Sequence, residues 1–273
     1  MRKRPSAFSG SRAERVLLLL GLVLTLSVLL FTLIGAFYTP YDPTEMNGLE
    51  KLSPPSLSHL FGTDKFGRDI FSRVMKGTLT TVSVALFTVA LGGAAGSLLG
   101  AVAGYYGGAA DAILMRLSDT LTAFPAVLPA LLIISLLGPG KYHVVLALSL
   151  VFVPSFTRVS RAAFAGERQK PYVTAARLQG ASDPRVLLLH MLPNTRRVLL
   201  PAVTIGFSNA VLAEAGMSYL GIGVTPPDAS LGYMLSEAQG LLSAAPWYAL
   251  ACGGVLLVAV LGVGLLGEGL KHA

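Results

Sequence analysis

The sequence predicts an all-α integral membrane protein with six transmembrane helices, and two observations support this prediction. Of its 273 residues, 53% are hydrophobic and only 13% are charged, whereas soluble domains carry about 25% charged residues. The mean hydropathy is +0.67, so the charges are too few to cover a soluble globule. The hydrophobic residues also gather into runs long enough to cross a bilayer, which takes ~20 apolar residues.

Six runs are predicted as membrane spans. They cover residues 16–37, 78–104, 113–137, 142–160, 201–223 and 246–267. The first follows five basic residues, as a secretory signal does, but it exceeds the ~7–15 apolar residues of a signal. Tyr38-Thr39-Pro40-Tyr41 follows it in place of a small-residue cleavage site. We therefore expect residues 16–37 to be an uncleaved first anchor.

The distribution of basic residues predicts the orientation, because Lys and Arg in short loops favour the cytoplasmic side. Residues 158–197 hold eight of them and residues 2–15 hold five, whereas residues 224–245 contain Asp228 and Glu237 and no base. The N-terminus is therefore expected to be cytoplasmic. The expected organisation is a cytoplasmic tail at 1–15, the anchor at 16–37, an extracytoplasmic loop at 38–77, a five-helix core at 78–267 with a cytoplasmic loop at 161–200, and a cytoplasmic tail at 268–273.

Several function classes are disfavoured. The net charge of +7 does not indicate nucleic-acid binding, because the bases lack the interleaved aromatic residues of single-strand readers. The single cysteine, Cys252, cannot form an internal disulfide or a Cys-based zinc site. Gly138-Pro139-Gly140-Lys141 lacks the spacing of an ATP-binding phosphate loop. We expect no catalytic, metal-binding or cofactor-binding residues in this chain.

The loop at 161–200 is predicted to be structured. Pro171 suits the first position of a helix, and small or amphipathic residues then recur at helical spacing: Tyr172, Ala175, Ala176 and Gln179. Gly180 is placed to end this helix in a left-handed conformation. A second helix is expected over 184–192, where Pro193 stops it. From the residues alone, a docking helix and an inert amphipathic loop are both open.

Three features of the spans carry further predictions. Gly92, Gly96, Gly100 and Gly104 give one smooth helix face, which predicts close approach of another helix. Arg116 and Asp119 are three residues apart and are expected to pair. Glu214 is an acid well inside an apolar run, where ionisable residues are costly and are functional candidates by default. For Glu214, a structural hydrogen bond is the favoured interpretation and a role in the transport pathway is the alternative.

Several motifs in combination resemble those of a known family. Thr174-Ala175-Ala176-x-x-x-Gly180 resembles the cytoplasmic loop motif of ABC importer permeases, with Thr174 where the family often has Glu. Residues Leu60 to Asp69 are similar to a signature that precedes the second span in dipeptide, oligopeptide and nickel permeases; its key residues are Gly62, Thr63, Asp64, Gly67, Arg68 and Asp69. The resemblance covers about residues 38–270, and the motif order is similar to that of the second, C-type permease subunit.

The resemblance implies a multi-pass protein of the bacterial cytoplasmic (inner) membrane with the type I ABC importer permease fold. It implies four kinds of partner: a homologous second permease, one or two ATPase subunits that bind the ATP, an extracytoplasmic solute-binding protein and the lipid bilayer. The chain itself would not be an enzyme. The residues expected to couple to the ATPase are Tyr172, Thr174, Ala175, Ala176, Arg177, Gly180 and Asp183.

The substrate is less well determined. Di- or oligopeptides are the first expectation, and nickel or a metallophore complex is the alternative. An ion-coupled secondary carrier is disfavoured, because such carriers carry internal repeats and several charges near the bilayer midplane. A membrane-bound enzyme is disfavoured because no paired carboxylates, nucleophile elbow or histidine metal motif occurs in any span.

Overall fold

The computed structural model describes residues 12–271, and over this range it is a bundle of helices joined by loops. The helices are α1 (Arg12–Phe37), α2 (Ile70–Tyr106), α3 (Gly108–Thr122), α4 (Val127–Leu137), α5 (Lys141–Arg168), α6 (Pro171–Leu178), α7 (Asp183–Arg185), the π-helical turn η1 (Val186–Met191), α8 (Leu192–Tyr219), α9 (Leu231–Gln239) and α10 (Pro246–Lys271). Five helices of the described residues are long and apolar enough to cross a membrane, or six if the bent pair α3–α4 forms one span. The predicted all-α membrane fold is confirmed.

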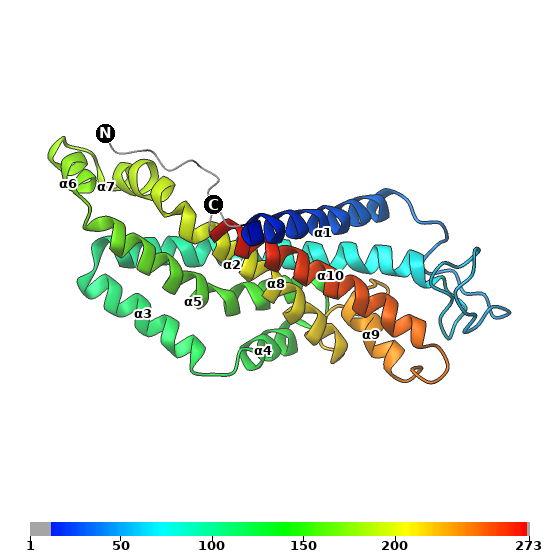
Figure 1. Ribbon diagram of the computed structural model, residues 1–273. Coiled ribbons are helices and arrows are strands. Elements are labelled where there is room, and N and C mark those ends of the chain that lie inside the picture. Colours follow the sequence, from blue (N-terminus) through cyan, green and yellow to red (C-terminus); the bar gives the residue numbers. More distant parts are fainter. Residues whose placement is uncertain (1–11, 272–273) are drawn as a thin grey trace.

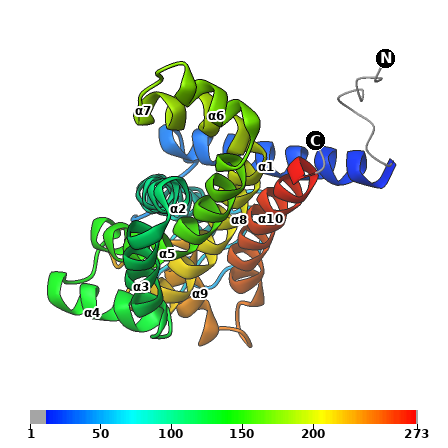
Figure 2. The ribbon, with the colours of Figure 1, turned by 90° about the vertical axis from the view of Figure 1, so that its left-hand side faces the viewer.

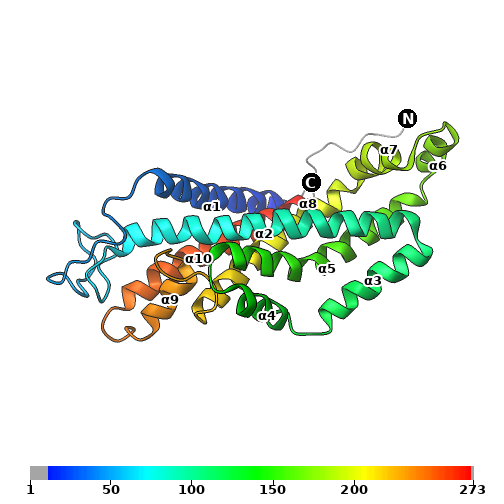
Figure 3. The same cartoon turned by 180° about the vertical axis from the view of Figure 1, so that it is seen from behind.

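The long helices lie roughly side by side, so the molecule is elongated (Figure 1). One end carries the loop 38–69 and α9, and we call it the loop end. The opposite end carries α6 and α7, and we call it the α6 end; Figure 2 views the bundle from this side. The view from behind shows α3 and α4 along the side of the bundle away from α1 (Figure 3).

The glycine face of α2 packs directly on α5, as the sequence predicts. A Cβ added at Gly92 or Gly96 would meet the backbone of Ser149 or Val153, and one at Gly104 would meet the backbone of Arg161. Because no side chain separates the two backbones at these points, α2 and α5 approach closely along much of their length.

Two apolar clusters hold the ends of the bundle. The larger lies among α2, α8, α9 and α10 toward the loop end and includes Val74, Val211, Met234 and Tyr248. The smaller lies at the α6 end, and we call it the α6 cluster. Its buried members are Ala101, Tyr105, Phe164, Val173, Ala176, Val186 and Met191. Many leucines on the outside of the spans are exposed, as suits helices that face lipid.

The helix that follows the first loop begins earlier than predicted. α2 starts at Ile70, not at residue 78, so the loop covers 38–69. Asp69 caps the helix, because its Oδ2 accepts a hydrogen bond from the Ser72 backbone N–H at 2.7 Å. A hydropathy criterion misses these first two turns because they contain Arg73 and Lys76.

The predicted third span is interrupted. Residues 113–137 form parts of α3 and α4, whose axes differ by 80°. The break contains Phe124-Pro125, and proline lacks the N–H that would continue the helix. The expected pair of Arg116 with Asp119 is also wrong. Asp119 pairs instead with Arg158 of α5 at 3.1 Å, because α3 lies beside α5 and that arginine is within reach.

The loop at 161–200 is shorter than predicted, because the flanking helices extend into it. α5 continues to Arg168, and α7, η1 and α8 run on as one span from Asp183 to Tyr219. Pro193 does not stop this helix, because it occupies the first turn of α8 directly after the π-helical turn, where its missing N–H is accommodated.

The remaining boundaries also differ in part. The segment 224–245 contains α9, and α10 continues through 268–271, where a tail was expected. Residues 1–11 of the expected N-terminal tail and residues 272–273 lie outside the described residues.

Candidate functional site

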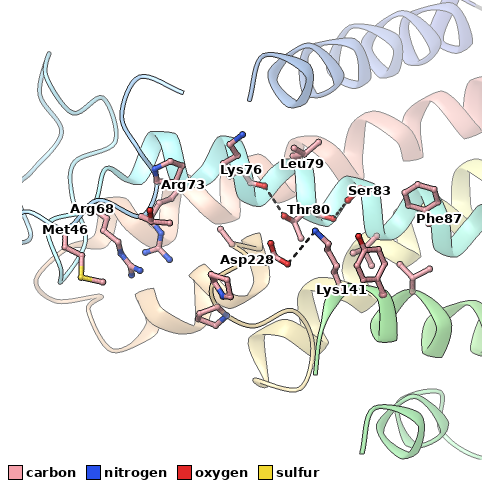
Figure 4. A pocket seen from close by; sticks show the side chains of 18 residues that line it. Met46, Arg68, Arg73, Lys76, Leu79, Thr80, Ser83, Phe87, Lys141 and Asp228 are labelled. Atoms are coloured by element: carbon pink, nitrogen blue, oxygen red, sulfur yellow. Dashed lines mark hydrogen bonds and ion pairs between the residues drawn. The ribbon is translucent and has the colours of Figure 1, made fainter. Parts of the chain in front are cut away.

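A cavity of about 720 Å³ lies at the loop end (Figure 4). Its walls come from the loop 38–69, α2, the start of α5 and the segment 226–229. The apolar lining includes Leu79, Val84, Phe87 and Val145, and the charged lining consists of Arg68, Arg73, Lys76, Lys141 and Asp228. This volume lies within the ~300–1,000 Å³ that is typical of sites for small organic ligands.

A buried charge network forms one wall of this cavity. Arg73, only 4% exposed, bonds Asp64 through Nη1 and donates to Glu237 Oε2 from Nη2 at 2.8 Å. Arg68 donates from Nε to Asp64 Oδ2 at 2.7 Å and from Nη2 to Glu237 Oε1 at 3.2 Å. Tyr248 of α10 donates to Glu237 Oε2 at 3.0 Å. Two arginines thus share two carboxylates, which satisfies charges that would be costly to bury alone.

The network joins parts of the chain that are far apart in sequence. Asp64 and Arg68 lie in the first loop, Arg73 in α2, Glu237 in α9 and Tyr248 in α10. Asp64 and Arg68 belong to the signature predicted from the sequence, whereas Arg73, Glu237 and Tyr248 were not predicted as site residues. The available signals were an arginine, Arg73, beside the start of an apolar run and an acid, Glu237, in a later loop. Neither signal indicated that the two residues would pair.

The other signature residues build the loop itself. Gly62 and Gly67 have φ of +70° and +76°, a region that favours glycine. A Cβ at Gly67 would also collide with the Asn47 carbonyl. The Thr63 hydroxyl bonds the Glu50 carbonyl and accepts from the Ser53 N–H at 2.9 Å.

Asp69 links the loop to α2. Besides capping α2, it contacts His59, whose Nδ1 lies 2.9 Å from Asp69 Oδ1. All six signature residues therefore lie in the loop or at its junction with α2, and their visible contacts are structural.

Glu214 of α8 is completely buried. Ser218 donates to Glu214 Oε1 at 2.7 Å, and the same Ser218 hydroxyl accepts from the Val224 N–H at 2.9 Å. The hydroxyls of Thr81 and Ser230 also face the carboxyl, although Oε2 makes no bond of good geometry. Glu214 does not line the large cavity. These contacts agree with the favoured interpretation that Glu214 makes a structural hydrogen bond. A role of Glu214 in the transport pathway stays the alternative prediction.

At the α6 end, the short helix α6 has one buried and one exposed face. Val173 and Ala176 are buried in the α6 cluster, whereas Thr174, Ala175, Arg177 and Gly180 are exposed. Gly180 has a φ of +81°, which confirms the predicted left-handed end of the helix. Leu178, at the tip, is 84% exposed. Ala176 is therefore packed against its own chain, and Ala175 is the small residue that faces outward.

Three of the predicted coupling residues hold α6 to the bundle. The Arg177 guanidinium lies 4.6 Å from the Tyr105 ring and donates from Nε to the Tyr105 hydroxyl at 3.2 Å. That hydroxyl donates to Asp183 Oδ1 at 2.5 Å. Tyr172 donates to Glu167 Oε2 at 2.6 Å. Burial, aided by this bond, raises the pKa of Tyr172 to about 12, from an ordinary value that already leaves the phenol neutral and able to donate at physiological pH.

Comparisons with known proteins agree with this architecture. Residues 96–268 match the family described as binding-protein-dependent transport system inner membrane component. The chain is 40% identical to the dipeptide transport system permease protein DppC of Haemophilus influenzae, over 93% of this chain and 88% of that protein. It is 35% identical to the dipeptide permease DppC of Alkalihalophilus pseudofirmus, over 94% of this chain and 84% of the relative.

A third relative matches the full length of the chain. The putative peptide permease protein BRA0407/BS1330_II0404 of Brucella suis is 38% identical over 100% of this chain and 90% of its own length. The family match and the long apolar helices also agree with a multi-pass protein of the bacterial cytoplasmic membrane. This chain belongs to the family of inner-membrane permease components of binding-protein-dependent transport systems, which are non-catalytic subunits of ABC importers.

Proposed function

We propose that this chain is one of two membrane-spanning permease subunits of an ATP-driven importer of short peptides, and that an ATPase subunit binds at α6. The observation that supports coupling at α6 is that one face of the helix is buried and the other is exposed. Val173 and Ala176 anchor one face in the α6 cluster, while Ala175 and Leu178 are exposed on the other. An anchored helix whose exposed side includes a small residue, Ala175, and an apolar one, Leu178, suits a partner that must both bind it and move it.

The proposal includes an orientation, with the N-terminus and the α6 end in the cytoplasm. It rests on the eight basic residues of 158–197, compared with none in 224–245. ATP then binds the separate ATPase, and the solute-binding protein delivers substrate at the loop end. ATP-driven closure of the ATPases would exchange inward-open and outward-open arrangements by rigid-body motion.

Cysteine labelling tests the orientation. Ser243 and Ser182 are both exposed and lie at opposite ends of the bundle, whereas Ser230 is buried and is unsuitable as a labelling site. We expect Ser243→Cys to react with an impermeant thiol reagent in intact cells, and Ser182→Cys to react only after permeabilisation. Reaction of both from the same side would contradict the topology.

Peptide is proposed as the substrate because the relatives reported above are named for dipeptides or peptides. Nickel or a metallophore complex is therefore not favoured, and membership in the binding-protein-dependent family argues against an ion-coupled carrier. The cavity at the loop end has room for a short peptide and combines apolar walls with charged groups.

Transport in cells tests the whole proposal. A strain without this chain should lose uptake of a radiolabelled dipeptide, and a plasmid copy should restore it. Uptake of nickel should be unchanged in both strains. Normal dipeptide uptake together with lost nickel uptake would favour the alternative substrate. Copurification of the ATPase with the parent chain, and not with an Ala175→Asp variant, would support docking at α6.

A further inference from the structure

The cavity at the loop end is lined by four cationic side chains, and three of them are engaged elsewhere. Arg68 and Arg73 are both held by Asp64 and Glu237 in the buried network. The Lys76 ammonium donates to the Ala36 carbonyl of α1 at 3.3 Å, and in Figure 4 its side chain points away from Lys141 and Asp228. These three cations therefore already have partners within the chain, and Lys76 is directed away from the Lys141 pair.

The fourth cation, Lys141, is held much more loosely. Its Nζ lies 3.6 Å from Asp228 Oδ2, and the two side chains are 38% and 46% exposed. Figure 4 shows the two side chains pointing toward each other. Lys141 lies at the start of α5, and Asp228 lies in the segment that precedes α9. A distance of 3.6 Å is longer than a good hydrogen bond, and exposed pairs of this kind contribute little to stability. A ligand can therefore replace one partner at small cost.

The rest of the cavity suits a ligand whose side chains vary. Near Lys141, the lining includes Val145 of α5 and Leu79, Val84 and Phe87 of α2. An apolar wall accepts many side chains with little discrimination, whereas one cation fixes a single anionic group. Every short peptide with a free C-terminus presents a C-terminal carboxylate, whatever its side chains. An extended dipeptide spans about 7 Å, and the volume of about 720 Å³ has room for it.

We propose that Lys141 binds the C-terminal carboxylate of the peptide in this cavity, and that Asp228 holds Lys141 when the cavity is empty. This inference rests on the proposed function, because it names the residue through which a peptide importer would recognise its substrate. Neither residue belongs to the family signature or to the α6 end.

The test measures occupancy of the cavity without the binding protein. Thr80 lines the cavity, and the native Cys252 is buried. A Thr80→Cys importer, purified in detergent with its partner subunits, is treated with a methanethiosulfonate reagent, and labelling of residue 80 is followed by mass spectrometry. Dialanine should slow the labelling, and its C-terminal amide should need a concentration about tenfold higher, since one charge-assisted hydrogen bond is lost.

Matched variants decide between Lys141 and the other cations. Lys141→Met should abolish the preference for the acid over the amide, whereas Lys141→Arg should retain it. Lys76→Met removes the same charge from the same cavity lining and should leave the preference unchanged. Asp228→Asn should lower the concentration of dialanine needed for half-protection by a few-fold, because it removes the competing carboxylate. An unchanged preference in Lys141→Met, or a raised concentration in Asp228→Asn, would overturn the assignment.

Failure of this inference can be distinguished from failure of the proposed function. If cells with the parent chain take up dialanine but residue 80 is protected equally by acid and amide, only the role of Lys141 is wrong. If the cells do not take up dialanine at all, the proposed peptide import is wrong.

Discussion

Both ends of the bundle contain an apolar cluster, and they differ in how deeply their charged groups are buried. At the loop end, buried Arg73, Asp64 and Glu237 connect the loop, α2 and α9 through charge-assisted bonds of fixed geometry. At the α6 end, the charged group is exposed: Arg177 stacks on Tyr105 and donates to its hydroxyl, which in turn donates to Asp183. A buried charge network fails when one member is lost, whereas an exposed charged contact contributes little and can be replaced by water. We therefore expect the loop end to be the more rigid of the two.

The largest expected effect is at Arg73. Arg73→Met leaves Asp64 and Glu237 without their most buried partner, and breaking a buried pair costs about 3–5 kcal/mol. We expect a clearly lower melting temperature of the purified protein and a lower level in membranes. Lys65→Met is the control, because Lys65 is 44% exposed and lies 3.8 Å from the same Glu237; it should change stability by less than about 1 kcal/mol. Equal effects of the two variants would show that the network does not brace the loop end.

The α6 end is tested by two neighbouring alanines. Ala176→Asp places an unpaired charge in the α6 cluster, which should destabilise it by about 3 kcal/mol, and limited proteolysis should then cleave near α6. Ala175→Asp lies on the exposed face, so the protein should remain intact but lose the ATPase in a quantitative pulldown. If Ala175→Asp binds the ATPase like the parent while Ala176→Asp does not, the docking face has been assigned to the wrong side.

The packing of α2 on α5, which connects the two ends, is tested at the glycine face of α2. A Cβ at Gly96 meets the Val153 carbonyl and Phe156, so Gly96→Ala should separate α2 from α5 and cost about 1–3 kcal/mol. Gly254→Ala in α10 meets nothing within 4 Å and should leave stability unchanged or slightly raised. Thermal unfolding of both variants side by side measures the difference, and a neutral Gly96→Ala would mean that the two helices need not be in close contact.

Glu214→Gln should have the smallest effect. The amide keeps a group that can bond Ser218, so the loss should stay below about 1.5 kcal/mol. Uptake of dipeptide, normalised to the amount of protein in the membrane, should remain near the parent level. Lost uptake at a normal protein level would show that the charge itself acts in transport, against the structural interpretation.

The sequence predicted those features that depend on local pattern. Runs of apolar residues gave the spans, the four-residue glycine spacing gave the contact between α2 and α5, and the position of Gly180 gave its left-handed turn. Features that depend on three-dimensional context were missed. Periodicity placed Ala175 and Ala176 on one small face, but it could not tell that Ala176 points inward. Likewise, Arg73 and Glu237 are 164 residues apart, and no local signal pairs them.

Proline gave one correct prediction, the start of α6 at Pro171, and one wrong prediction, the stop at Pro193, because its effect depends on the surrounding backbone. Pro125 lies at a sharp bend between α3 and α4, whereas Pro193 lies in a helix that continues through it. The difference lies in the backbone around each residue. A π-helical turn directly precedes the first turn of α8 and accommodates Pro193, and Pro125 stands where α3 has already ended.

The length of α2 has a mechanical consequence. Its 37 residues make a rod of ~55 Å, stiffened on one side by its contact with α5. Asp69 caps the rod at one end, and at the other end Tyr105 contacts Arg177 and Asp183 beside α6. Leu79 to Phe87 of the same rod form a wall of the large cavity. If the rod pivots at its braced end, a tilt of ~5° at α6 displaces Tyr105 by ~5 Å but Thr80 by only ~1.5 Å. The helix would therefore act as a lever, so that a large displacement at α6 produces a smaller displacement of the cavity wall.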